Sequence, residues 1–335
     1  MKIIVPMAGR GSRLRPHTLT TPKPLIPIAG KPIVQRLVED IVHICGDENV
    51  EEVAFVIGDF GKEVEDELVA VAERLGAKGT IYHQDQPLGT AHAILCAAPS
   101  MDGELVVAFA DTLFRADFTL DDDADGVIWV KQVDNPKAFG VVEVDQQGHI
   151  NNFVEKPQEF VSDLAIIGIY HFKDGANLRA ELQYLIDHDI KDKGEYQLTN
   201  ALDNMKNKGK KFKPGKVEDW MDCGNKDVTI ETNSRMLGFL KGMPELRGTG
   251  VVIENSTVIE PCYLGNNVVL RNATIGPNVS LGNGTVVENA TLTSCLVQHD
   301  TEIKNIKLTN SMIGSKAYVD GEYTSLSLGD YCRME

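Results

Sequence analysis

Residues 3–32 read I-I-V-P-M-A-G-R-G-S-R-L-R-P-H-T-L-T-T-P-K-P-L-I-P-I-A-G-K-P. The apolar run at residues 3–5 predicts a buried strand, and a helical stripe of apolar residues begins at Ile33. Between them lie residues 8–32, the opening loop, with three glycines that permit close approach to a ligand and five prolines that stiffen the chain. A strand, a long stiff loop and a helix in this order predict an α/β fold that begins with a ligand-binding loop.

The opening loop is basic within an acidic chain. The net charge of the chain is −16, yet its first acidic residue is Glu39. Seven cations precede that residue: Lys2, Arg10, Arg13, Arg15, Lys23, Lys31 and Arg36. Cations without counter-charges beside a glycine turn are typical of a polyphosphate site. The run is not the dinucleotide fingerprint, because position 14 is leucine, and it is not a Walker A loop, because no G-K-[ST] follows.

Length and composition exclude several classes of protein. With 335 residues the chain has room for two domains. No apolar run approaches the length of a membrane span, and the N-terminus lacks a signal-peptide pattern. Six dispersed cysteines without a C-x-x-C pair fit a reducing compartment and argue against a zinc site. The acidic balance argues against nucleic acid or an anionic membrane as partner. We therefore expect a cytoplasmic protein.

The first 110 residues alternate apolar strands with amphipathic helices, which predicts a Rossmann-like, mainly parallel sheet with helices on both faces. Such sheets bind ligands beyond the carboxyl ends of their strands. Strands that end near Val5 and Ala110 would bring the opening loop and Asp111 to that edge. Residues 126–172 contain short strands separated by turn residues, and they predict an inserted, largely antiparallel lid.

The C-terminal part has a different texture. Glycines and a proline near residue 242 predict a boundary between a first domain, 1–242, and a second, 243–335. Beyond it an aliphatic residue recurs every five or six positions, at Ile253, Ile259, Leu264, Leu270, Ile275, Leu281 and Val287. This period resembles the hexapeptide repeat of a left-handed parallel β-helix. Five N-x-[ST] matches are interpreted as corner asparagines rather than glycosylation sites: Asn255, Asn272, Asn278, Asn283 and Asn289.

The complete run G-x-G-x-R-L-x-P-x-T-x-x-x-P-K-P-L-x-P-x-x-G-K-P, which starts at Gly9, resembles the signature of the sugar-1-phosphate nucleotidyltransferases. The thymidylyl members of that family, which use glucose 1-phosphate, are the nearest in character. The resemblance implies that the triphosphate is bound by Ala8, Gly9, Gly11, Ser12 and Arg13. It also implies catalytic roles for Arg13, on the departing pyrophosphate, and for Lys23, on the α-phosphate.

Further motifs follow in the family's order. The run Q-D-Q-P-L-G-T resembles its base-recognition loop, with Gln84, Pro87, Gly89 and Thr90 as nucleotide contacts. The metal pair of the family corresponds to Asp111 and Asp222, which implies Mg²⁺ as cofactor. Thr112 stands where the family has Asn or His. The implied sugar-phosphate contacts are Gly140, Glu155, Lys156, Ile166 and Trp220, and the E-Y-Q-L-T-N run at residues 195–200 has a supporting role.

The expected reaction joins dTTP or UTP to a sugar 1-phosphate, by default glucose 1-phosphate, and releases pyrophosphate for polysaccharide or cell-surface sugar biosynthesis. Mannose-1-phosphate guanylyltransferase is the alternative within the family. A β-helix acyltransferase would need a histidine base, for which the repeats offer His299. A non-catalytic regulatory subunit would be expected to have lost part of the set Arg13, Lys23, Asp111 and Asp222. The repeats are expected to pack against other subunits in a homo-oligomer.

Overall fold

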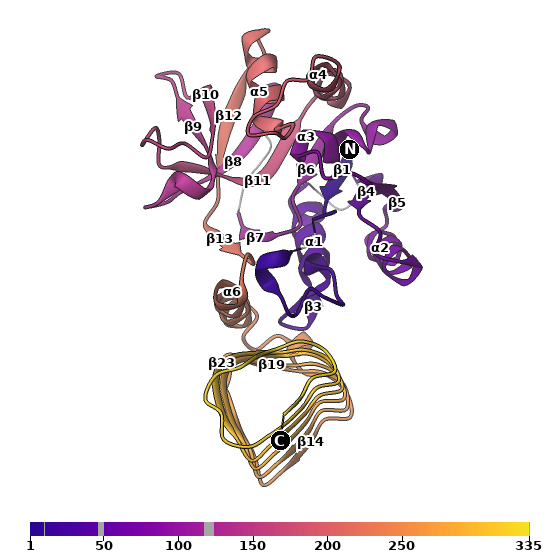
Figure 1. Ribbon diagram of the computed structural model, residues 1–335, viewed down its shortest axis with the longest axis vertical. Coiled ribbons are helices and arrows are strands. Elements are labelled where there is room, and N and C mark those ends of the chain that lie inside the picture. The colour runs from indigo at the N-terminus through magenta and orange to yellow at the C-terminus, as the bar shows by residue number, and fades with distance from the viewer. Residues whose placement is uncertain (10, 46–49, 117–123, 335) are drawn as a thin grey trace. The chain divides into compact units, whose positions relative to one another are not determined.

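The computed structural model describes residues 1–9, 11–45, 50–116 and 124–334 (Figure 1). The described chain forms two compact units. The first contains residues 1–9 and 35–220, and the second contains the described residues of 10–34 and 221–335. Most of the opening loop therefore belongs to the same unit as the C-terminal repeats. Linear order along the chain did not predict this division, because it results from tertiary contacts.

The first unit is built on one nine-stranded sheet of order β10-β9-β11-β6-β1-β4-β5, with β8 paired to β11 and β12 to β8. The strands β5, β4, β1 and β6 are parallel, as the alternating pattern predicts. The strands are β1 (Lys2–Pro6), β4 (Glu52–Ile57), β5 (Lys78–His83), β6 (Leu105–Ala108), β8 (Gly126–Gln132), β9 (Gly140–Val144), β10 (Ile150–Glu155), β11 (Leu164–Phe172) and β12 (Phe212–Lys216).

The strands expected to form an inserted lid continue this same sheet. They are antiparallel as predicted, but β11 pairs directly with β6, so the parallel and antiparallel parts share one ladder. The register of β11 shifts between Ile166 and Tyr170, where Gly168 has a φ of +89°. This break lets one half of β11 pair with β6 and the other half with β9. Hydrophobic alternation fixes which face of a strand is buried but not its partner, so the sequence did not reveal this continuity.

Helices flank the sheet near their expected positions: α1 (Ile33–Cys45), α2 (Lys62–Arg74), α3 (Thr90–Leu95), α4 (Gly175–Asp187) and α5 (Leu198–Asn207). Helix α2 begins directly after Gly61, which has a φ of +83° at the N-cap. A core of fully buried aliphatic residues joins the sheet to the helices, among them Ile4, Val107 and Leu182. Because these strands are parallel, the carboxyl ends of β1, β5 and β6 lie at one edge of the sheet. Candidate site residues of the first unit follow these ends.

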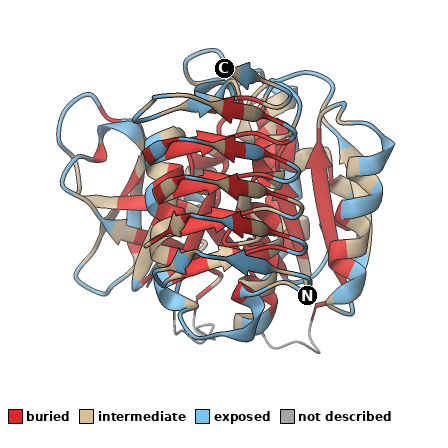
Figure 2. Cartoon of the chain, turned by 90° about the horizontal axis from the view of Figure 1, so that it is seen from below, coloured by how far each residue is buried: buried red, intermediate tan, exposed pale blue. Residues whose placement is uncertain are grey.

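The second unit contains α6 (Lys226–Phe239) and a parallel β-helix, which Figure 1 shows as stacked coils and Figure 2 as rungs with buried residues. One face consists of β14 (Val252–Glu254), β17 (Val269–Arg271), β20 (Val286–Glu288), β22 (Glu302–Lys304), β24 (Tyr318–Asp320) and β26 (Arg333–Met334). The other faces consist of β15 (Thr257–Val258), β16 (Cys262–Leu264), β18 (Thr274–Ile275), β19 (Val279–Leu281), β21 (Thr291–Val297), β23 (Lys307–Ile313) and β25 (Ser327–Leu328).

The predicted inward residues are confirmed at Leu264, Leu270, Ile275, Leu281 and Val287, which are all fully buried. The prediction is wrong for Ile253 and Ile259, which are 43% and 44% exposed. Both lie at the start of the first coil, in or next to β14 and β15, which among the described strands pair only with the following coil. The strictly periodic pattern could not show where the stack begins.

The asparagine corners are confirmed by a left-handed φ at Asn255, Asn272, Asn278 and Asn289, whereas at Asn283 the left-handed residue is the following Gly284, with a φ of +69°. Asn255, Asn272 and Asn289 have left-handed φ angles of 47–50°, which asparagine tolerates better than most residues. Their side chains form a ladder: Nδ2 of Asn255 donates to Oδ1 of Asn272 at 2.7 Å, and Asn272 donates to Asn289 at 3.2 Å. The ladder continues to Asn305 at 3.1 Å. Each rung spans 16 or 17 residues, so three faces of five or six residues complete one coil.

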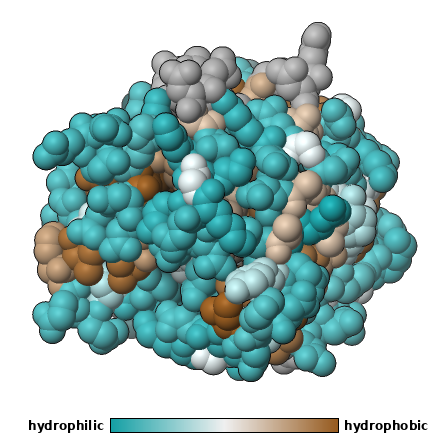
Figure 3. All heavy atoms as spheres, turned by 90° about the horizontal axis from the view of Figure 1, so that it is seen from above, coloured by the Kyte–Doolittle hydropathy of each residue, from teal (hydrophilic) through white to brown (hydrophobic). Residues whose placement is uncertain are grey.

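Four short strands complete the fold: β2 (Pro27–Ile28) pairs with β3 (Lys31–Pro32), and β7 (Thr112–Arg115) pairs with β13 (Asp219–Asp222). No described helix is both long enough and apolar enough to cross a membrane. The face seen in Figure 3 is mostly hydrophilic, with small separate hydrophobic patches.

Candidate active site

The opening loop in the second unit folds back on its own glycine turn. Gly11 has a φ of +60°, and a Cβ added there would lie 2.8 Å from Cβ of Lys23. The Thr18 hydroxyl donates to the Gly11 carbonyl oxygen at 2.8 Å and closes the turn. Both the backbone angle and the close approach therefore require glycine at position 11. Lys23 is nearly buried beside this turn, so the loop brings together two of its predicted site residues.

Other predicted contacts of the loop lie at its surface. Ser12 and Arg13 are exposed in a short 3-10 helix, and the Arg13 side chain forms no ion pair with the described residues. Ala8 and Gly9 follow β1 in the first unit, and a Cβ added to Gly9 would meet no heavy atom within 4 Å. The space beside Gly9 is therefore open to a ligand. Arg10 lies outside the described residues.

The base-recognition candidate Gln84 is held in one orientation. Its Nε2 donates to the Gly89 carbonyl oxygen at 3.3 Å and lies 3.0 Å from Nδ1 of His92. A carbonyl can only accept, so the amide NH₂ must point this way, and Nδ1 of His92 must also accept. Burial lowers the pKa of His92, which favours the neutral ring that can accept. Oε1 of Gln84 is thus left as the acceptor for a ligand. The sequence motif did not point to His92, because its contact with Gln84 is made only in the folded loop.

The loop around Gly89 is clamped by residues 195–198. A Cβ at Gly89 would lie 2.5 Å from the Tyr196 carbonyl oxygen, and the φ of Gly89 is +112°. Ala91 N donates to that oxygen at 2.9 Å, and Tyr196 N donates to the Leu88 carbonyl oxygen at 2.9 Å. Thr90 is tied to the same segment, since its hydroxyl accepts from Leu198 N at 3.0 Å. Pro87 is exposed. The E-Y-Q-L-T-N run thus fixes the shape of the base loop.

The predicted sugar contacts Gly140, Glu155 and Ile166 meet on β9, β10 and β11. A Cβ at Gly140 would lie 3.1 Å from Oε2 of Glu155 and 3.4 Å from Cδ1 of Ile166. Thr199 lies at the same place, with its Cγ2 3.7 Å from that Cβ position. Because residue 140 has no side chain, space remains between Glu155 and Ile166. Glu155 offers a largely buried carboxylate that can accept hydrogen bonds, as from sugar hydroxyls.

Two lysines lie beside Glu155. Nζ of Lys156 is 3.5 Å from Oε1 of Glu155, and its side chain is 54% exposed. Nζ of Lys193 lies 3.4 Å from the carbonyl oxygens of both Glu155 and Lys156. Lys193 is a cation that the motif search missed, because no family motif covers its position. The two lysines give this region positive charge beside the Glu155 carboxylate.

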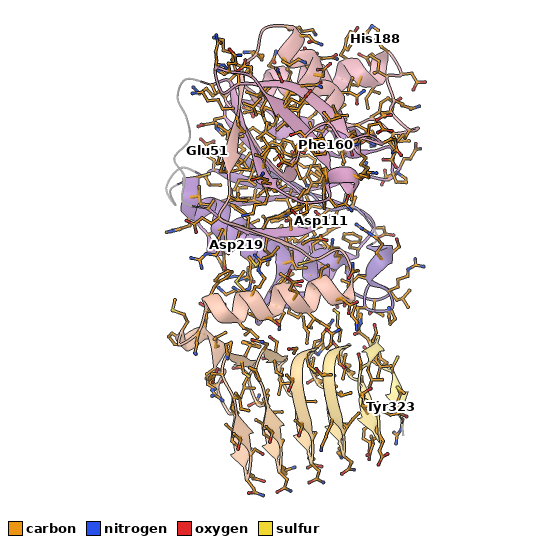
Figure 4. The ribbon with its side chains drawn as sticks, turned by 90° about the vertical axis from the view of Figure 1, so that its left-hand side faces the viewer. Glu51, Asp111, Phe160, His188, Asp219 and Tyr323 are labelled. Atoms are coloured by element: carbon orange, nitrogen blue, oxygen red, sulfur yellow. The ribbon has the colours of Figure 1, made fainter. Side chains whose placement is uncertain are left out.

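Asp111 is exposed in the turn between β6 and β7 (labelled in Figure 4). Burial raises the pKa of Tyr170, and the negative charges of Glu155 and Asp111 raise it further. Both carboxylates therefore act on one tyrosine of β11. The neighbouring Thr112 hydroxyl accepts a hydrogen bond from Nε1 of Trp220, whose ring packs edge-on against Phe139 at 4.8 Å between centroids. Thr112 thus positions the predicted Trp220.

Asp222, in the second unit, is shaped by its neighbours. A Cβ at Gly224 would lie 2.7 Å from Oδ2 of Asp222, so only glycine leaves the carboxylate in this position. The Thr232 hydroxyl of α6 donates to the Asp222 carbonyl oxygen at 2.6 Å. Cys223 is fully buried. Among the described residues no three His, Cys, Asp or Glu side chains form a metal-binding group.

The model of the nucleotidyl transferase family matches residues 2–237. The chain is 30% identical over 267 residues to the low-salt glycan biosynthesis nucleotidyltransferase Agl11 of Haloferax volcanii, which covers 77% of this chain and 71% of that protein. It is also 30% identical over 271 residues to the bifunctional protein GlmU of Methanococcus maripaludis, of which it spans 62%.

The mannose-1-phosphate guanylyltransferase catalytic subunit beta of Drosophila melanogaster is 35% identical over 191 residues, which is 54% of this chain and 51% of that protein. Among solved structures, UDP-glucose pyrophosphorylase complexed with UDP-glucose superposes with a TM-score of 0.57 at 23% identity. That match covers 71% of this chain and 98% of that one. At this identity the structural match supports the fold alone.

Proposed function

The chain belongs to the nucleotidyl transferase family, and from this premise we propose that it transfers a nucleoside monophosphate from dTTP or UTP to glucose 1-phosphate. Nucleotidyl transfer to a sugar 1-phosphate is the activity of the family, and its product would serve glycan biosynthesis. The observation that favours dTTP, UTP or GTP over ATP and CTP is the fixed amide of Gln84.

Gln84 and Gly89 together match one kind of base edge. Oε1 of Gln84 accepts, and the backbone N–H of Gly89 makes no hydrogen bond with the described residues, so it can donate. A base that offers an N–H beside a C=O fits this pair. Thymine, uracil and guanine have that edge, whereas adenine and cytosine offer an acceptor nitrogen beside an amino group. The pair therefore favours dTTP, UTP or GTP over ATP and CTP.

The chemistry requires charge neutralisation more than proton transfer. The second pKa of a phosphate monoester is about 6, so a sugar 1-phosphate is mostly dianionic at neutral pH and can attack without a general base. Lys156 and Lys193 would hold the attacking phosphate, while Glu155 orients the sugar. Arg13 and Lys23 would neutralise charge that builds on the triphosphate. These roles require cations rather than a proton acceptor.

We propose Mg²⁺ as the cofactor, held by the carboxylates of Asp111 and Asp222. Asp111 is an exposed carboxylate at the end of a strand, and Gly224 leaves room for that of Asp222. Hard oxygen ligands in small number suit Mg²⁺, which keeps water and substrate phosphates as further ligands. When bound, the ion would supply charge stabilisation for the transferred phosphate.

GTP with mannose 1-phosphate is the second candidate, favoured by the 35% identity to the guanylyltransferase subunit. The edge that Gln84 contacts is the same in guanine and uracil. The choice between UTP and GTP therefore depends on whether the site has room for the larger purine. For the acyltransferase alternative, His299 is exposed and lies 2.9 Å from Oδ2 of Asp300, on a corner of the β-helix. An exposed histidine at such a corner is not the buried general base that an acyltransferase would need.

The test is a panel of dTTP, UTP, GTP, ATP and CTP, each with the 1-phosphates of glucose, mannose and N-acetylglucosamine, scored by pyrophosphate release. We expect dTTP or UTP with glucose 1-phosphate to give the highest kcat/KM. A preference for GTP and mannose 1-phosphate would select the second candidate. Turnover that is highest with ATP or CTP would overturn the reading of Gln84. The variant His92→Phe, which frees the Gln84 amide to rotate, should reduce discrimination against ATP about tenfold.

A further inference from the structure

Within the second unit the opening loop contacts both ends of the β-helix, at β16 in its first coil and at residues in and after β25 in its last. The hydroxyl oxygen of Ser327, in β25, lies 3.2 Å from Nε2 of His17. The Thr20 hydroxyl donates to Oδ2 of Asp330, whose other oxygen accepts from Ser315 N at 2.7 Å. The opening loop therefore bonds to the Asp330 carboxylate, which Ser315 of the β-helix already holds in place.

A second contact lies at the β2–β3 turn, in the other half of the loop. Ala29 and Gly30 both have left-handed φ angles, +47° and +88°. Such a conformation is strained for alanine, and the surrounding structure must hold it. Against this turn lies Tyr263 of β16, whose ring is only 2.2 Å from the position that a Cβ on Gly30 would take.

Asn233 of α6 connects the strained turn to the β-helix. This side chain is fully buried. Its Oδ1 accepts from Ala29 N at 2.9 Å and from the Ser280 hydroxyl of β19 at 2.8 Å. Figure 4 shows α6 running across the edge of the β-helix strands. The same helix holds the backbone of Asp222 through Thr232, at 2.6 Å. One helix thus links the repeats, the loop and a candidate metal ligand.

We infer that the β-helix of this chain is a positioning element for the opening loop, so that the repeats set the affinity for the nucleoside triphosphate. The ligand identity rests on the proposed function, but the mechanical link does not. Ser280, Asn233 and Asp330 are positioning residues, because they act on the loop and touch no reacting group. This role is distinct from subunit packing, for which the repeats were expected.

The first experiment measures hydrogen exchange at residues 16–30 of the full-length chain. The variants are Thr20→Val, which keeps the shape and removes the hydroxyl, and Ser280→Ala, which removes the β-helix end of the Asn233 bridge. Each loses one hydrogen bond, so exchange at these residues should become about threefold to tenfold faster. Thr20→Ser keeps the hydroxyl and should behave as the unmodified chain. Unchanged exchange in both variants would overturn the inference.

The control for general damage to the repeats is Thr285→Val. Thr285 is fully buried and donates to the Gln298 carbonyl oxygen at 3.1 Å, within the β-helix. This variant should lower the unfolding midpoint without altering exchange at residues 16–30. If it accelerates exchange there as much as Ser280→Ala does, the link is global stability rather than positioning.

Kinetics then test the functional consequence. In Thr20→Val and Ser280→Ala the KM of the triphosphate should rise about threefold to tenfold, while that of the sugar 1-phosphate stays within twofold. An equal rise in both values would mean that the contacts only maintain the fold, and would overturn the role in triphosphate affinity. If the unmodified chain releases no pyrophosphate with any substrate, the proposed function fails, and the exchange results still decide whether the β-helix positions the loop.

Discussion

Acidification should weaken the contact between the opening loop and the β-helix through His17. The side chain of His17 is fully buried, and its Nδ1 has no hydrogen-bond partner among the described atoms. Burial lowers the pKa of His17 from 6.5 to about 4; the charge of Asp330 opposes this shift, and that of Lys226 adds to it. The folded protein therefore keeps a neutral imidazole at a pH where the unfolded chain has already bound a proton.

The sign and size follow from linkage. Because the folded pKa is the lower one, the unfolded state binds more protons between pH 6.5 and about 4, and the free energy of unfolding falls as the pH drops through that window. The loss from His17 should be about 2 kcal/mol at pH 5 and about 3 kcal/mol below pH 4. Above pH 7 this contribution is constant.

The assay compares the unmodified chain with His17→Gln, which cannot titrate. Urea unfolding is followed by far-ultraviolet circular dichroism at pH 7.5 and pH 5, because Trp129 and Trp220 both lie in the first unit and would not report on the second. Asp40, whose pKa burial raises to about 6, titrates equally in both proteins and cancels in the difference. The reasoning is refuted if the two proteins lose the same stability at pH 5, or if the His17 resonance titrates near 6.5.

Asp111→Asn should lower kcat at least a hundredfold without changing the unfolding midpoint, because it removes a proposed metal charge; near-normal rates in Mg²⁺ would exclude Asp111 as a ligand. Gly224→Ala places a Cβ 2.7 Å from Oδ2 of Asp222 and should raise the Mg²⁺ concentration for half-maximal rate severalfold; an unchanged value would separate Asp222 from the metal. Gly140→Ala crowds Oε2 of Glu155 at 3.1 Å, so the KM of the sugar 1-phosphate should rise severalfold while that of the triphosphate does not; the reverse pattern would exclude Gly140 from the sugar site.

The sequence by itself determined the family, the order of the elements and the residue types of the candidate site. Periodicity reports burial within one element, so α1, the parallel strands and the repeats were predictable from local pattern. Corner asparagines were predictable for the same reason, because a left-handed φ is a property of one residue. Motif resemblance supplied Arg13, Lys23, Asp111 and Asp222 without any knowledge of their surroundings.

Only the tertiary structure decided which segments meet. Strand pairing depends on hydrogen bonds between distant residues, so the continuity of β11 with β6 was not predictable from alternation. The roles of His92 and Lys193 depend on neighbours that lie 8 and 38 residues away in sequence. Above all, the opening loop belongs with repeats some 300 residues later, through contacts such as His17 with Ser327 and Thr20 with Asp330. A local pattern records the burial of each partner but not its identity, because many distant surfaces could cover the same side chain.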